Sequence, residues 1–275
     1  MDLLVQALFM GVVQGLTEFL PVSSSGHLIV VPFLAGWDDP FITSLAFSVM
    51  LHIGTLAALL VYFRADWFRL VPAGVAAVRD RSFAGDPDRR LAWLLLASTV
   101  PAAIAGVLLN DLIATAFREI GLVAVTLVVG AAILWLADRL GARTKDVHDV
   151  TLPVALAIGA AQALALVPGI SRSGISIAAA RLAGLDRPAA ARFSFLMATP
   201  VTAGAALFEV RSLVSGDAGV DVSVGPLVVG MVAAFISGAL AIGALLRYLR
   251  SSSLDVFVGY RLVLAATVLV VWLGR

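Results

Sequence analysis

The distribution of apolar residues along the chain predicts a protein built from membrane-spanning helices. A helix needs about 20 mainly apolar residues to cross the hydrocarbon core of a bilayer. Six stretches meet this requirement, at residues 41–63, 91–109, 119–137, 192–210, 225–246 and 256–273. We therefore expect an all-α polytopic membrane protein with six full transmembrane helices.

Two further apolar stretches, 3–35 and 152–184, are interrupted by polar and helix-breaking residues. The interruptions are Gln14, Glu18, Pro21, Ser23, Ser24, Ser25, Gly26 and His27 in the first, and Pro168, Gly169, Ser171, Arg172, Ser173 and Gly174 in the second. In each stretch an apolar helix leads into a Pro/Gly/Ser turn, and a second apolar helix follows. A turn at membrane depth must be buried in protein or line a watery cavity, because lipid offers its backbone no hydrogen bonds. Each stretch therefore predicts a re-entrant helical hairpin.

The composition agrees with a location in a bilayer. Of the 275 residues, 61% are hydrophobic and 13% are charged, whereas an average soluble domain has about 25% charged residues. The net charge of +1 gives no reason to expect nucleic-acid binding, and the absence of cysteine excludes disulfides and thiolate metal ligands. The first residues carry no basic segment ahead of the apolar run, so we expect no cleavable signal peptide.

Basic residues alternate between the segments that connect the predicted spans. The rich segments carry Arg64, Arg69, Arg79, Arg81, Arg89 and Arg90, then Arg139, Arg143 and Lys145, then Arg247 and Arg250. By contrast, segment 110–118 has one basic residue, Arg118, and segment 212–224 has none. Because basic segments stay in the cytoplasm, both termini and the first hairpin are predicted on the outer side. The second hairpin then enters from the cytoplasm.

The two hairpins align with each other at one constant offset. The offset pairs Gln14 with Gln162, Ser23 with Ser171, Ser25 with Ser173 and Gly26 with Gly174. We therefore expect one membrane domain, 1–275, made of repeat 1 (1–140, hairpin 3–35) and repeat 2 (150–275, hairpin 152–184). Each repeat holds one hairpin and three spans, and since three is odd, the repeats run in opposite directions. Inverted repeats of this kind place a site near the midplane at the repeat interface.

The first hairpin carries the residues best suited to chemistry. Gln14 and Glu18 are four residues apart and share one helix face, and Ser23, Ser24, Ser25 and His27 follow at once. A carboxylate inside a bilayer costs several kcal/mol unless it is paired or hydrated, so something must hold Glu18. A polar packing contact between helices is the alternative interpretation.

The second hairpin resembles a phosphate-binding turn. The run PGISRSG at 168–174 places Arg172 between two serines and just before an apolar helix. A Gly/Ser turn that opens a helix presents backbone N–H groups to an anion, and a guanidinium adds a planar donor fork suited to phosphate oxygens. Arg172 could instead simply neutralise Glu18, and the two roles are compatible.

Together the hairpins predict a site for phosphoryl transfer, in which positioning and charge neutralisation supply most of the catalysis. A nucleophile needs a base within hydrogen-bond reach. Ser24 with His27 or Glu18 is one candidate pair, and direct attack by His27 is another; both remain open at this point. His52 lies inside an apolar span. It could approach the site, but we expect a helix–helix contact.

Three motifs carry a resemblance to a known family. The run QGLTEFLPVSSSGH at 14–27 is similar to the first signature of the undecaprenyl-diphosphate phosphatase family, also called the bacitracin resistance protein family. PGISRSG at 168–174 resembles its second signature, and RFSFLMATP at 192–200 resembles a further family stretch. The likeness extends over nearly the whole chain.

The resemblance implies a bacterial inner-membrane enzyme that hydrolyses undecaprenyl diphosphate to undecaprenyl phosphate and inorganic phosphate. That reaction recycles the lipid carrier of cell-wall synthesis and confers resistance to bacitracin. By motif, the catalytic positions are Glu18, Ser24, His27 and Arg172, and the substrate-binding positions are Gln14, Ser23, Ser25, Ser171, Ser173, Gly169 and Gly174. The expected partners are a polyprenyl diphosphate and membrane lipids, with a homodimer as the assembly. The active site is expected to open to the outer, periplasmic side.

The resemblance also implies a divalent cation, Mg²⁺ or Ca²⁺, with Glu18 as the candidate ligand. The chain departs from the family pattern here, because Gln14 stands where a second carboxylate is common. A single carboxylate would have to share the ion with the diphosphate. The second signature usually ends in Thr, and Ser176 keeps the hydroxyl at that place.

Two other classes of protein deserve comparison. Acid-phosphatase-like lipid phosphatases require a histidine six residues after the arginine, and Ala178 occupies that position. A lipid transporter would also show inverted repeats, broken helices and an anion site at the midplane. Turnover distinguishes it, since a pure transporter would bind the lipid and release no phosphate.

Overall fold

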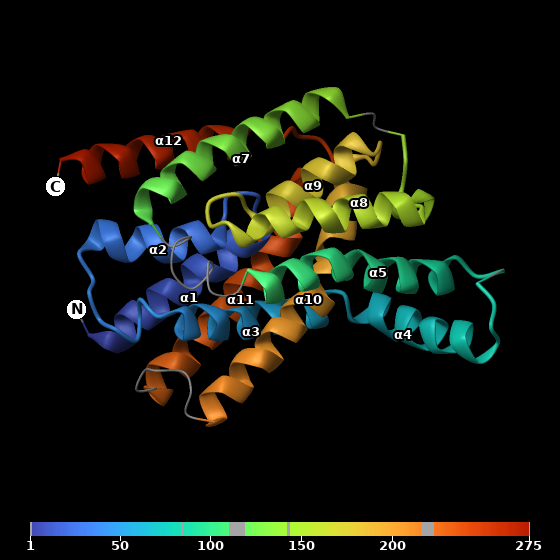
Figure 1. Cartoon of the computed structure of the whole chain (residues 1–275), viewed down its shortest axis with the longest axis horizontal. Coiled ribbons are helices and arrows are strands. Elements are labelled where there is room, and N and C mark those ends of the chain that lie inside the picture. Colours follow the sequence, from blue (N-terminus) through green and yellow to red (C-terminus); the bar gives the residue numbers. More distant parts are fainter. Residues whose placement is uncertain (1, 84, 110–118, 142–143, 216–222, 275) are drawn as a thin grey trace.

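The computed structural model describes residues 2–83, 85–109, 119–141, 144–215 and 223–274, and most of these residues are helical. Within them lie eleven α-helices and two short 3₁₀ helices, with one isolated bridge between Lys145 and Leu185 and no strand (Figure 1). The helices are α1 (Leu3–Phe19), α2 (Ser24–Ala35), α3 (Leu45–Tyr62), α4 (Arg64–Arg79), α5 (Pro87–Leu108), α7 (Ile120–Leu140), α8 (Leu152–Ala163), α9 (Arg172–Leu182), α10 (Arg187–Ser215), α11 (Val224–Tyr248) and α12 (Asp255–Leu273). The all-α prediction is confirmed.

Five of these helices are long and apolar enough to cross a membrane: α3, α5, α7, α11 and α12. They match five of the six predicted spans. The sixth predicted span, 192–210, lies within α10, a continuous helix that is not among the five. The chain is therefore a multi-pass membrane protein, and the count of six spans stays a prediction.

Both interrupted stretches form pairs of short helices. Helices α1 and α2 are joined by a turn, and so are α8 and α9, where the 3₁₀ helix Leu164–Leu166 ends α8. Serine caps the second helix of each pair: Ser23 (φ 77°) accepts from the Gly26 N–H at 3.3 Å, and Ser171 (φ 76°) accepts from the Gly174 N–H at 3.1 Å. The residues aligned by the sequence offset thus share one unusual backbone geometry, which a non-glycine residue adopts only when its surroundings enforce it.

Each hairpin packs on a helix from the other half of the chain. Helix α1 lies along α11, where a Cβ at Gly11 would overlap the Gly230 carbonyl. Helix α8 lies along α5, where a Cβ at Gly159 would overlap the backbone of Ser98. Small residues let helices approach this closely in a membrane, where close packing drives association.

The basic segment after α3 forms a helix rather than a loop. Helix α4 lies beside α5 (Figure 1). An ion pair of 2.5 Å between Asp66 and Arg192 ties it to α10. It exposes Phe68 (79% exposed), Val71, Val75 and Val78 on one face. A helix with an exposed apolar stripe and flanking arginines suits the membrane interface.

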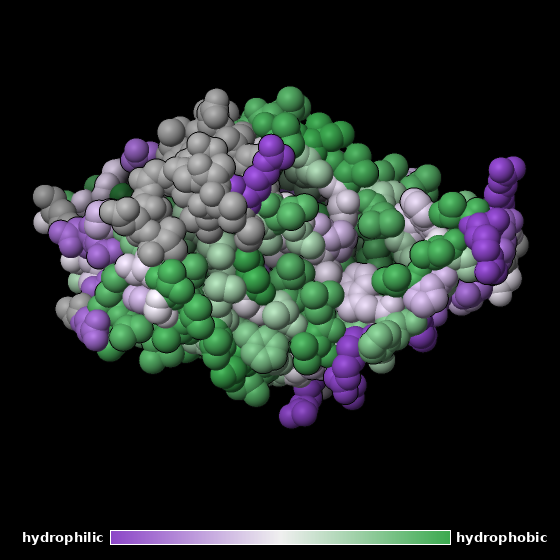
Figure 2. Space-filling model, turned by 90° about the horizontal axis from the view of Figure 1, so that it is seen from below, coloured by the Kyte–Doolittle hydropathy of each residue, from purple (hydrophilic) through white to green (hydrophobic). Residues whose placement is uncertain are grey.

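The two chain ends and this basic segment lie at opposite ends of the long axis of the molecule. Both termini lie at one end, and the connection between α4 and α5 lies at the other (Figure 1). In Figure 2 apolar residues cover much of the middle of one face, and hydrophilic residues gather densely at one end. The expectations that rest on Arg118, on Arg143, on segment 110–118 and on residues 216–222 of segment 212–224 lie outside the described residues.

Candidate active site

The turns of the two hairpins are in direct contact. The Gly169 N–H donates to Ser23 Oγ at 3.0 Å, and Ser173 Oγ donates to the Leu20 carbonyl at 3.0 Å. Thr126 of α7 closes the second turn by donating to the Pro168 carbonyl at 2.5 Å. The hydroxyls of Ser23 and Ser173, expected to bind substrate, therefore hold the two turns together.

Glu18 is the centre of a buried polar cluster at this junction. Its side chain is 3% exposed, and its Oε1 accepts from the Arg172 guanidinium at 2.7 Å. Its Oε2 accepts from Gln14 Nε2 at 3.0 Å and from the Ser24 hydroxyl. The structure thus brings together Gln14, Glu18, Ser24 and Arg172 from the predicted set. The ion pair with Arg172 offsets the cost of burying a carboxylate inside the protein.

His52 also reaches this cluster. Its Nε2 lies 3.4 Å from Glu18 Oε2, and its Nδ1 lies 2.7 Å from the Ser48 carbonyl. This contact joins α3 to α1, which pack side by side, so the expected helix–helix contact and the approach to the site are one and the same. Glu18 is therefore flanked by Arg172 on one oxygen and by His52 on the other.

His27 does not contact Ser24 or Glu18 by a hydrogen bond in the described part of the chain. Its Nδ1 lies 2.7 Å from the Ser23 carbonyl, and its Nε2 lies 2.6 Å from the Tyr260 hydroxyl. Because a carbonyl can only accept, Nδ1 carries a proton, and in the neutral ring Nε2 accepts from Tyr260. The two rings are also stacked, with centroids 5.6 Å apart. Of the pairs left open by the sequence, this geometry favours Ser24 with Glu18.

Two helix N-termini add positive potential to the site. Helix α2 begins at Ser24 and α9 begins at Arg172. The first N–H groups of a helix have no intrahelical partner, and here the serine caps satisfy only those of Gly26 and Gly174. The remaining N–H groups, together with Arg172, form an anion-binding arrangement. Ser24 and Ser25 lie in one of these first turns, and Ser173 in the other.

Arg261 of α12 forms hydrogen bonds with both turns. Its guanidinium is fully buried and donates to the carbonyls of Gly169 at 2.5 Å, Ile170 at 3.1 Å and Pro21 at 3.4 Å. Neither Tyr260 nor Arg261 was predicted from the sequence. The signal that could have found them is the Tyr-Arg pair inside an apolar span, since ionisable residues in spans are rare and mark functional sites.

The residues present do not fit a divalent cation held by the protein. Both Glu18 oxygens are engaged by Arg172, Gln14, Ser24 and His52, and the described residues contain no cluster of three His, Asp or Glu side chains. Ca²⁺ and Mg²⁺ prefer several oxygen ligands. No catalytic step is therefore assigned to a metal held by these side chains.

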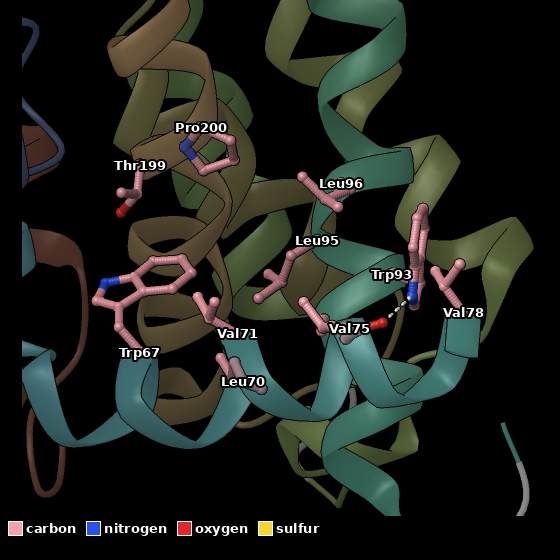
Figure 3. Close-up of a pocket in the computed structure, with 12 residues that line it drawn as sticks. Trp67, Leu70, Val71, Val75, Val78, Trp93, Leu95, Leu96, Thr199 and Pro200 are labelled. Atoms are coloured by element: carbon pink, nitrogen blue, oxygen red, sulfur yellow. Dashed lines mark hydrogen bonds between the residues drawn. The ribbon is translucent and has the colours of Figure 1, made fainter. Parts of the chain in front are cut away.

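An apolar pocket lies between α4, α5 and α10 and includes none of these polar residues. It has a volume of about 330 Å³. Trp67 and Val71 of α4 face Leu95 of α5 and Pro200 of α10 across it, and Trp93 Nε1 donates to the Gly74 carbonyl at 3.1 Å (Figure 3). Its walls suit a hydrocarbon chain and lack the donors that a diphosphate needs.

The fold and the site together define a polytopic helical membrane protein with a buried carboxylate, an arginine and two helix N-termini at the junction of two hairpin turns. The chain belongs to the family described as "Bacitracin resistance protein BacA", whose model matches residues 7–267. It is 44% identical to the undecaprenyl-diphosphatase of Desulforudis audaxviator over 270 residues, which cover 98% of each chain. It is 46% identical to that of Gemmatimonas aurantiaca over 96% of each chain. It is 45% identical to that of Thioalkalivibrio sulfidiphilus over 98% of each chain.

Proposed function

We propose that this chain hydrolyses undecaprenyl diphosphate to undecaprenyl phosphate and inorganic phosphate, and so recycles the lipid carrier used for cell-envelope polymers. Its family membership and the names of its relatives support this activity. The observation that carries it is the Ser24 hydroxyl donating to the buried Glu18 carboxylate, with Arg172 beside them. A hydroxyl, a base and a cation at one point are the parts that phosphoryl transfer requires.

Ser24 is the proposed nucleophile and Glu18 its base. The Ser24 oxygen forms a bond to the terminal phosphorus while its proton passes to Glu18. The bond from that phosphorus to the bridging oxygen breaks, and undecaprenyl phosphate leaves. Water then attacks the phosphorus of the phosphoserine, and the bond from that phosphorus to Ser24 Oγ breaks. The proton held by Glu18 returns to the Ser24 oxygen, and inorganic phosphate leaves.

Arg172 and the N-termini of α2 and α9 hold the phosphate oxygens during both steps. Arg172 uses one nitrogen, NH2, for Glu18, and a guanidinium has five N–H donors in a planar fork. It can therefore bind phosphate and carboxylate together. Substrate binding brings negative charge to the junction, where the helix termini stabilise it.

His27 is not the proposed nucleophile. It is proposed to support the reaction by holding the turn before α2 in place. Both of its nitrogens are engaged, by the Ser23 carbonyl and by Tyr260. Its contact with Ser23 joins it to the residue that caps the helix bearing Ser24. Gln14, whose Nε2 donates to Glu18, orients the carboxylate.

A divalent cation is proposed to arrive on the diphosphate, since the protein side chains do not offer a set of ligands for it. Mg²⁺ commonly binds through substrate phosphates with few protein ligands. Chelation should then lower turnover without changing the thermal stability of the substrate-free protein. Loss of stability on chelation would indicate an ion bound by the protein itself.

The chain is proposed to lie in the bacterial inner membrane with the site open to the periplasmic side. The alternation of basic segments supports this orientation, and spent carrier is released at that face. The shared serine-cap geometry of the two hairpins supports an inverted repeat of 1–140 and 150–275 within one domain. We also propose that the chain crosses the membrane six times and assembles as a homodimer.

Turnover by purified protein in detergent tests the proposed function. The expected result is release of inorganic phosphate from a polyprenyl diphosphate, and a phosphorylated Ser24 peptide by mass spectrometry after acid quenching. Binding of the lipid without any phosphate release, with Mg²⁺ or Ca²⁺ present, would instead favour a transporter.

A further inference from the structure

Arg261 is a fully buried arginine, in a helix apolar enough to span a membrane, without an acidic partner among the described residues. It lies in α12, one of the candidate spans, and is 0% exposed. None of the ion pairs in the described part of the chain involves it. A buried charge that is not paired must be compensated by hydrogen bonds. The acceptors around the guanidinium therefore indicate the role of Arg261.

The neighbours of Arg261 are backbone carbonyls from three parts of the chain. NH2 donates to Gly169 and Ile170 in the second hairpin turn, and NH1 donates to Pro21 in the first. Nε donates to Leu127 of α7 at 3.2 Å. One side chain thus connects both hairpin turns to a membrane span.

Two glycines make room for this guanidinium. A Cβ at Gly130 of α7 would overlap Arg261 NH2, and a Cβ at Gly174 of α9 would lie 3.2 Å from NH1. The slot is therefore shaped for the planar fork, and Gly130 offers a second way to disturb it while leaving Arg261 in the sequence.

The carbonyls that Arg261 binds determine the direction of the adjoining N–H groups. A peptide group is planar, so fixing the Ile170 carbonyl also fixes the Ser171 N–H, and fixing the Pro21 carbonyl fixes that of Val22. Ser23 and Ser171, close behind, both hold a positive φ that needs support from the surroundings. Their helices, α2 and α9, begin with Ser24 and Arg172.

We propose that Arg261 is a positioning residue that holds the two hairpin turns in register, so that Ser24 and Arg172 meet at the reacting phosphate. It acts through the turns and does not touch the substrate. This role rests on the proposed phosphatase function. It predicts that loss of the hydrogen bonds from Arg261 to the two turns lowers the rate of the chemical step more than it lowers the affinity for the lipid.

The test compares Arg261→Met and Arg261→Lys with Arg181→Met in detergent, measuring kcat, KM and Tm. Arg181 is the control for burial, because it is equally buried and bonds several carbonyls at the opposite end of α9, where it also pairs with Asp138. Arg261→Met should lose about 100-fold in kcat, the size of effect that a misplacement of about 1 Å produces. Arg261→Lys should be intermediate, since an ammonium has three donors instead of a fork. Arg181→Met should lower Tm and keep kcat.

Gly130→Ala keeps the inference testable even if Arg261→Met does not fold. It should displace the guanidinium and lower kcat with Arg261 still present. Wild-type kcat in folded Arg261→Met or in Gly130→Ala would overturn the inference, and so would an equal loss of kcat in Arg181→Met. Absence of phosphate release by the wild-type protein would contradict the proposed function instead.

Discussion

At the scale of single residues, the site depends on how Glu18 is kept charged and oriented inside the protein. Arg172 binds one of its oxygens, and Gln14 and Ser24 bind the other. The importance of Glu18, Ser24 and Arg172 was predictable, because polar residues are conspicuous in an apolar sequence. The contribution of Tyr260 and Arg261 was not, since each reaches the site from a span whose neighbours are set by helix packing.

Replacing Glu18 by Gln should remove the base while keeping the shape of the side chain. We expect kcat to fall by about 10²- to 10⁴-fold, the range that a general base contributes. Phosphate release under saturating substrate measures the effect. Glu119→Gln, at an exposed carboxylate before α7, is the control and should keep full activity. Activity of Glu18→Gln within twofold of the wild type would remove Glu18 from the role of base.

Replacing Tyr260 by Phe should free His27 Nε2 without removing the stacked ring. The lost hydrogen bond is worth about 0.5–1.5 kcal/mol, so we expect kcat to fall by roughly 2- to 10-fold. Tyr248→Phe, at a tyrosine of α11 that packs edge-on against Phe257, is the matched control. Equal kcat values for both variants would show that Tyr260 does not position His27.

At the scale of elements, each hairpin is organised by the serine that caps its second helix. The hydrophobic pattern and the Pro/Gly/Ser composition were sufficient to predict both breaks, because apolar helices cannot continue through such turns. The pattern did not predict that Ser23 and Ser171 take a positive φ. That conformation depends on tertiary contacts, such as the bond from the Gly169 N–H to Ser23 Oγ.

Substitutions at Ser171 should separate the contribution of the cap hydrogen bond to stability from that of the strained backbone conformation. Ser171→Ala loses the cap bond and keeps the strain of a Cβ at φ 76°, whereas Ser171→Gly loses the bond and relieves the strain. We expect the Ala variant to unfold about 0.5–2 kcal/mol more easily than the wild type, and the Gly variant to lie between them. Thermal unfolding in detergent ranks the three proteins, and an Ala variant as stable as the Gly variant would contradict this account.

At the scale of the whole molecule, the two halves are joined by their hairpins. Helix α1 packs on α11, and α8 packs on α5, so each hairpin lies against a helix of the other half. The junction between the turns is therefore held by both halves. Because each hairpin packs on the other half, Arg172 lies against Glu18, although 154 positions separate them in the chain.

The predicted orientation can be tested by labelling, because the chain has no native cysteine. Asp38→Cys, in the exposed connection after α2, should react with a membrane-impermeant maleimide in intact spheroplasts. Ser251→Cys, exposed between α11 and α12, should react only in inverted vesicles. The opposite pattern would reverse the orientation and place the first hairpin on the cytoplasmic side.

The sequence by itself determined the class of protein, the two broken hairpins and the identity of their polar residues. These follow from local physics, since lipid excludes charge and unpaired backbone. The tertiary structure alone decided which atoms meet. It paired Ser24 with Glu18 and turned His27 toward Tyr260, and it set Arg261 behind both turns. Such contacts join residues far apart in the chain, and they depend on the exact packing of helices that share one apolar composition.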